Sequence, residues 1–132
     1  MMTITFVPYL GYDDAAAALD FFEAAFGFTR SADYRDDQGV VLHAEVQFGG
    51  GAFMLGTGGD QQRDPAKRAT APGRGVYTVV DDVDAHYLRA KAAGATIVYP
   101  PEDTEFGTRR YRALDPEGYE WSFGTYAPKT AD

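Results

Sequence analysis

The chain has 132 residues, no cysteine and a net charge of −8 at pH 7. Its length and its 45% hydrophobic content predict one compact globular domain. The absence of cysteine excludes disulfides and thiolate chemistry, and the acidic charge argues against nucleic acid, where Lys and Arg must contact phosphate. No apolar run approaches the roughly 18 residues of a membrane span. We therefore expect a cytoplasmic protein without a membrane or nucleic-acid partner, whose acidity is compatible with a cationic ligand.

The first half of the chain predicts one helix among four strands. Asp13-Asp14 supplies an N-cap for the helix, and Gly27 ends it. Gly11 is expected to end the first strand. The expected elements are a strand at 3–10, a helix at 15–26, and strands at 28–34, 40–48 and 52–55.

The second half repeats this order after a loop rich in Gly, Pro and charge. The pair Asp81-Asp82 again precedes a helix, and Gly94 ends it. This half-length repeat predicts an α+β fold of two βαβββ modules within a single domain. The expected parts are a first module at about 3–57, a linker loop at about 58–74 and a second module at about 75–126. Within the second module we expect a strand at 76–80, a helix at 83–93, a strand at 96–99, a loop at 100–107 and a final hairpin.

The final hairpin turns at the sequence Asp115-Pro116-Glu117-Gly118. Asp, Pro and Gly each favour a turn for a separate backbone reason. Because side chains alternate along a strand, Ser122 faces away from Trp121, which is expected in the core. If the turn comprises residues 115–118, Tyr111 lies across the hairpin from Ser122.

These segments resemble the vicinal oxygen chelate superfamily, which includes glyoxalase I, bleomycin-resistance proteins and extradiol dioxygenases. The resemblance spans about residues 3–126. It rests on Asp14 with Phe21-Phe22, on Phe26-Gly27-Phe28, on residues 80–84, on residues 92–95 and on residues 115–119.

The resemblance implies curved sheets around a cavity, commonly in a homodimer. It also implies a divalent metal held by His or Glu from four strands. At the matching positions this chain has Val7, Met54, Gly75 and Ser122. These residues do not form the imidazole- and carboxylate-rich site that such metals need, so we expect neither a metal nor another cofactor.

His43 and Glu45 are the candidate catalytic residues. The alternation of residues 40–48 predicts Val40, Leu42 and Ala44 on one apolar face and His43 with Glu45 on the other. A His and a Glu two residues apart could transfer protons as a pair, or could anchor a ligand, or could have no role.

The candidate ligand-binding residues line the expected cavity, and they favour a planar or extended organic ligand. Ordinary packing is an open alternative for the tyrosines. Arg109, Arg110 and Arg112 could clamp a carboxylate or phosphate, although paired surface charges are a common alternative. His86 is expected to be solvated or at a boundary, without a functional role. The ligand-binding candidates are Tyr9, His43, Glu45, Met54, Tyr77, Tyr111 and Ser122.

Three hypotheses for function follow. The first is a metal-free, non-enzymatic binder of the bleomycin-resistance kind, a homodimer that sequesters an aromatic or cationic antibiotic-like compound. The second is a metal-independent isomerase or lyase that uses His43 and Glu45. The third is a metal-dependent glyoxalase or dioxygenase with a relocated site at His43, Glu45 and Glu120.

Overall fold

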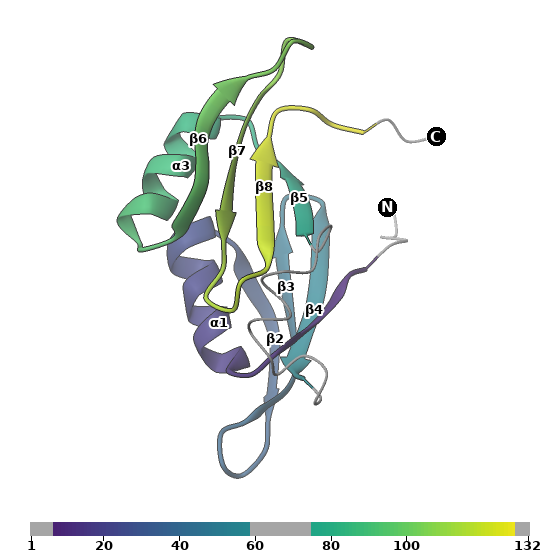
Figure 1. Cartoon of the computed structure of the whole chain (residues 1–132). Coiled ribbons are helices and arrows are strands. Elements are labelled where there is room, and N and C mark those ends of the chain that lie inside the picture. The colour runs from purple at the N-terminus through teal and green to yellow at the C-terminus, as the bar shows by residue number, and fades with distance from the viewer. Residues whose placement is uncertain (1–6, 59–74, 129–132) are drawn as a thin grey trace.

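The computed structural model describes residues 7–58 and 75–128, and Figure 1 shows two sheets that lie end to end with both helices on one side. Most of the expected loop at 58–74, and residues 3–6 of the first expected strand, lie outside the described residues. The elements are β1 (Tyr9–Tyr12), α1 (Ala15–Phe21), a π-helical turn η1 (Phe22–Phe26), β2 (Thr29–Arg35), β3 (Val41–Phe48), β4 (Gly51–Thr57), β5 (Gly75–Val79), α3 (Val83–Ala92), β6 (Thr96–Asp103), β7 (Arg109–Leu114) and β8 (Glu120–Gly124).

Two four-stranded sheets of identical topology form the fold. Sheet A has the order β1-β4-β3-β2, and sheet B has the order β5-β8-β7-β6. In each sheet the first strand of the module pairs in parallel with the last, and the other pairs are antiparallel. The predicted α+β fold of two βαβββ modules is therefore confirmed.

The helix ends follow the sequence signals. The Asp14 side chain accepts a hydrogen bond from the amide of Ala17 at 3.0 Å, and Asp82 accepts one from Ala85 at the same distance. Gly27 follows η1 with φ of 75°, a left-handed conformation that glycine adopts without a steric penalty. None of the helices in the described ranges is long and apolar enough to cross a membrane.

A largely aromatic core fills the space between the helices and one face of both sheets. Phe22 and Phe26 of η1 lie 5.2 and 5.7 Å from Trp121 of β8, measured between ring centroids. Phe53 of β4 lies 5.1 Å from the same indole. Trp121 is only 1% exposed, so it lies in the core, as its position on the strand predicted. Because it also contacts the first module, it joins the two modules into one core.

The turn of the last hairpin binds the first module through hydrogen bonds. The buried Asp115 carboxylate accepts one from the Tyr12 hydroxyl at 2.6 Å and one from Trp121 Nε1 at 2.9 Å. The Glu117 carboxylate accepts the amides of Asp13 and Asp14 at 2.6 and 2.8 Å. These contacts fix the start of α1 against residues 115–119 of the other module.

Three local predictions were wrong. β1 continues through Gly11 to Tyr12, because parallel pairing with β4 holds that residue in the sheet. β6 extends to Asp103 instead of ending at Tyr99, since it is an edge strand, where proline is tolerated and the register is irregular. In β3 a register shift relative to β2 breaks the alternation, so Val41 is buried and Leu42 is 59% exposed.

Candidate functional site

The outer face of sheet A, which points away from the helices, gathers four of the predicted site residues. In the strand register Tyr9 lies beside Met54, and Met54 lies beside Glu45. His43 is on the same strand as Glu45, two residues earlier. Residues that are neighbours across strands share a face of the sheet, so the fold brings Tyr9, Met54, Glu45 and His43 together.

His43 is the centre of this group. Its Nε2 lies 2.9 Å from Glu45 Oε2, which makes Nε2–H the donor to the carboxylate. Its ring is stacked between Tyr9 at 6.4 Å and Tyr34 at 6.2 Å, with interplanar angles of 25° and 26°. Tyr9 and Tyr34 are 59% and 63% exposed, so this row of three rings presents an open aromatic surface.

Tyr34 is a site residue that the sequence reasoning missed. It ends the expected strand at 28–34, and the register places it directly opposite His43 across the β2–β3 hairpin. The turn signal Asp36-Asp37-Gln38-Gly39 could have indicated this pairing. The register shift beside it, between Tyr34 and Arg35, explains why simple alternation did not.

The outer face of sheet B holds the remaining predicted residues, with one correction. Tyr77 pairs with Ser122, as expected for two neighbours on one face. Tyr111 instead pairs with Phe123 and is fully buried, so its prediction as a pocket residue was wrong. The residue across from Ser122 is Arg112, whose Nε donates to Ser122 Oγ at 2.9 Å.

An extra residue in the hairpin loop causes this change of register. Asp115 accepts the amide of Gly118 at 3.0 Å, and Gly118 has φ of 88°. The Asp115 amide also donates to the Tyr119 carbonyl, so that the loop contains one residue more than a two-residue turn. A type I turn followed by a left-handed glycine forms such a bulged hairpin, and the pairing moves by one, from Tyr111 to Arg112.

His86 lies half-buried at the boundary of the core, one of the two expected positions. Its Nε2 donates to the Phe26 carbonyl at 2.9 Å, so its Nδ1 accepts from the Tyr111 hydroxyl at 2.6 Å. Its ring is 4.2 Å from that of Phe123. Burial lowers the pKa of His86 and raises the pKa of Tyr111, which favours the neutral form of both side chains.

The divalent metal site that the resemblance implies does not fit these residues. Val7 and Met54 offer no hard ligand, and a side chain at Gly75 would begin 3.0 Å from the Glu120 carbonyl oxygen. The relocated set of His43, Glu45 and Glu120 is not brought together either. Within residues 7–58 and 75–128, no three His, Cys, Asp or Glu side chains are grouped closely enough to hold a metal ion.

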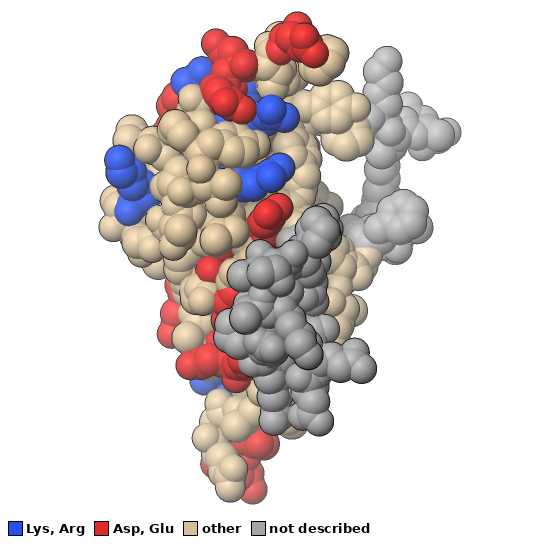
Figure 2. Space-filling model, in the orientation of Figure 1, with Lys and Arg blue, Asp and Glu red and all other residues tan. Residues whose placement is uncertain are grey.

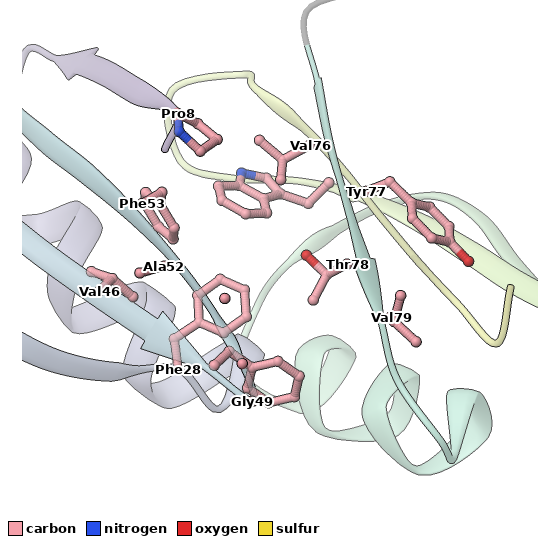
Figure 3. A pocket seen from close by; sticks show the side chains of 14 residues that line it. Pro8, Phe28, Val46, Gly49, Ala52, Phe53, Val76, Tyr77, Thr78 and Val79 are labelled. Atoms are coloured by element: carbon pink, nitrogen blue, oxygen red, sulfur yellow. The ribbon is translucent and has the colours of Figure 1, made fainter. Parts of the chain in front are cut away.

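A cleft of about 410 Å³ opens where β5 borders the β3–β4 hairpin, and Figure 3 shows it from close by. Phe28, Phe53 and Trp121 line it from the core, and Thr78 and Val76 line it from β5. The glycines at 49–51 form part of its rim without side chains to fill it. Of the predicted ligand-binding residues only Tyr77 lies at this cleft, so the cleft is separate from the outer face of sheet A.

Fold and sequence together define the class of this protein. The model of the glyoxalase/bleomycin resistance protein/dioxygenase superfamily matches residues 5–123, and the chain belongs to that superfamily. An uncharacterized protein of Mycobacterium bovis, Mb0911c, is 34% identical over 122 residues, which are 89% of this chain and 80% of that protein.

Solved structures agree with this membership. TioX from Micromonospora sp. ML1 is 33% identical with a TM-score of 0.74, and the match covers 97% of this chain and 100% of TioX. A superfamily member from Sphaerobacter thermophilus is 25% identical with a TM-score of 0.61, covering 92% of this chain and 97% of that one. Proteins of this superfamily commonly act as dimers and bind small molecules.

Proposed function

We propose that this protein binds a planar aromatic small molecule on the outer face of sheet A and acts by sequestering it. The observation that carries the proposal is the row formed by Tyr9, His43 and Tyr34, in which two strongly exposed tyrosines flank a stacked imidazole. Exposed aromatic rings held in one row are suited to stacking with a flat ligand.

The charge of this face favours a cationic ligand. Glu45 is partly exposed and places a carboxylate beside the row. A cationic ring would be attracted both by this carboxylate and, through cation–π contact, by the faces of Tyr9 and Tyr34. An antibiotic-like aromatic cation would combine these features.

The proposal is tested with 9-aminoacridine, a flat cation, by isothermal titration calorimetry. We expect the replacement Tyr34→Ala to weaken binding about 3- to 10-fold, since an aromatic contact contributes roughly 0.5–1.5 kcal/mol. Glu45→Gln should weaken binding about 2- to 5-fold at low salt, in line with a half-exposed ion pair. Leu88→Ala is the control, because Leu88 is equally exposed at 63% but lies on α3. Equal affinity in all three variants would contradict the proposal.

The chain is also proposed to form a homodimer. Core aromatics line the apolar cleft beside β5, and among the residues that the structure describes β5 pairs only with β8 and forms an edge of sheet B. A second copy would cover both. Light scattering coupled to gel filtration should give twice the chain mass of 14.4 kDa, whereas a single-chain mass would contradict the dimer.

A second candidate function is proton transfer by His43 and Glu45 in a metal-independent isomerase or lyase. The distance of 2.9 Å between Nε2 and Oε2 favours it, because the carboxylate orients the imidazole as in known acid–base pairs. Exchange of α-protons of small 2-oxo acids in D₂O, followed by NMR, tests it. Enzymatic exchange that disappears in His43→Ala would support this function, and exchange that persists would contradict it.

A further inference from the structure

The outer face of sheet B carries two arginines that share one tyrosine ring. Arg110 and Arg112 are two residues apart on β7 and therefore point to the same side. Their guanidinium carbons lie 5.7 and 5.4 Å from the ring centroid of Tyr99 on β6. Cation–π contact of this kind restricts the guanidinium groups without using their N–H donors.

Carboxylates hold these two arginines more loosely than they hold Arg109, which precedes both on β7. Arg109 points to the opposite side and makes three hydrogen bonds of 2.9–3.0 Å to Asp84 and Asp103. Arg110 reaches Glu102 only at 3.3 and 3.4 Å. Arg112 Nη1 is 3.6 Å from Glu120, beyond hydrogen-bond distance. An anion bound closer to these guanidinium groups would therefore accept hydrogen bonds from N–H donors that Glu102 and Glu120 do not approach closely.

Ser122 orients Arg112 for such an anion. Its Oγ accepts the Nε–H of Arg112 at 2.9 Å, on one side of the guanidinium. The two terminal nitrogens of Arg112 make no hydrogen bond with any residue that the structure describes, and the side chain is 36% exposed. The two terminal nitrogens of the planar guanidinium group can donate in parallel to the two oxygens of a carboxylate.

A hollow with aromatic walls lies on the Arg110 side of this arrangement. It has a volume of about 460 Å³, within the range of small-molecule sites. Tyr77, Phe106 and Tyr126 line it together with Arg110, and Phe106 is 81% exposed at the tip of the β6–β7 hairpin. Figure 2 shows basic groups over β7 and β8 with acidic groups beside them.

We propose that the outer face of sheet B is a second binding site, which takes a planar aromatic carboxylate. The ring occupies the hollow beside Tyr77 and Phe106, and the carboxylate binds to the arginines stacked on Tyr99. A singly charged carboxylate fits better than a phosphate, because Glu102 and Glu120 lie close and would repel a second negative charge. This site is separate from the proposed site on sheet A and has the opposite preference for charge.

The test compares 2-naphthoate with its neutral analogue 2-naphthamide by isothermal titration calorimetry. The wild-type protein should bind 2-naphthoate at least tenfold more tightly, the effect expected of a charge-assisted hydrogen bond. Arg112→Gln should abolish this preference, and Arg112→Lys should keep only part of it, because lysine keeps the charge but not the fork. Ser122→Ala, which removes only the orienting acceptor, should reduce it about 2- to 5-fold.

Arg35→Gln is the matched control, since the Arg35 side chain has the same exposed fraction as Arg112, 36%, but lies on β2 of sheet A. Circular dichroism verifies that each variant is folded. Equal binding of the two probes to the wild-type protein, no binding of 2-naphthoate, or an unchanged preference in both Arg112 variants would overturn the proposal. None of these results affects the site on sheet A, which 9-aminoacridine and Tyr34→Ala test separately.

Discussion

Replacing Asp115 with Asn should destabilise the fold strongly, although the two side chains have nearly the same shape. Asp115 Oδ2 accepts the Tyr12 hydroxyl and Trp121 Nε1–H, and Oδ1 accepts the amides of Glu117 and Tyr119. An asparagine has one acceptor oxygen, so its NH₂ group must face two of these donors. Two hydrogen bonds to a charged acceptor are lost at a site where the side chain is buried.

The expected loss follows from these contacts. A hydrogen bond to a charged group contributes about 1.5–3 kcal/mol, and a buried donor left without an acceptor costs about 1–3 kcal/mol. We expect Asp115→Asn to lower the free energy of unfolding by about 3–5 kcal/mol, a large share of a typical total of about 5–15 kcal/mol. Tyr12→Phe removes one donor and leaves the carboxylate three, so it should cost about 1–2 kcal/mol.

Urea denaturation measures both values. Trp121 is the only tryptophan of the chain and lies in the contact, so its fluorescence reports on the joint between the modules, and circular dichroism reports on the fold as a whole. In the double variant the two effects should not add, because both act on the same hydrogen bond. A loss below about 1 kcal/mol for Asp115→Asn, or additive effects, would refute the assigned role of the carboxylate.

Two further predictions concern stability. Burial lowers the pKa of His86, so the unfolded chain binds a proton there that the folded chain does not. The free energy of unfolding should therefore fall as the pH drops from about 7 through the unfolded pKa of about 6.5, and His86→Gln should flatten this slope in denaturation curves. Gly75→Ala should lower the midpoint of thermal unfolding by several degrees, because its Cβ would lie 3.0 Å from the Glu120 carbonyl. Gly50→Ala should leave the midpoint unchanged, because Gly50 has open space around it. Equal midpoints in the two variants would contradict the steric conflict between a side chain at residue 75 and the Glu120 carbonyl.

Much of the fold could be predicted because its signals are local. Asp14 and Asp82 cap the helices by side chains that reach three residues along the chain, and Gly27 ends η1 by its own backbone conformation. Such signals do not depend on distant contacts. The pairing of β1 with β4 through Gly11 does depend on them, and the sequence prediction ended that strand too early.

The candidate site could be predicted only in part, since strand register decides which side chains share a face. Alternation predicted that His43 and Glu45 share a face, and they do, because no shift falls between these two residues. Their roles stay predictions. Tyr111 was placed on the wrong face because one extra residue in the loop at 115–119 moves the pairing by one. The same shift brings Arg112 to Ser122, a contact that alternation along one strand cannot reveal.

NMR titration of the wild-type protein with 9-aminoacridine shows whether a flat aromatic ligand stacks on the outer face of sheet A. We expect the largest chemical-shift changes on the rings of Tyr9, His43 and Tyr34, which the bound ring would cover. The Trp121 indole, which lies at the separate cleft beside β5, should change little. Shifts concentrated on Trp121 with an unchanged His43 ring would assign ligand binding to the cleft and rule out stacking on sheet A.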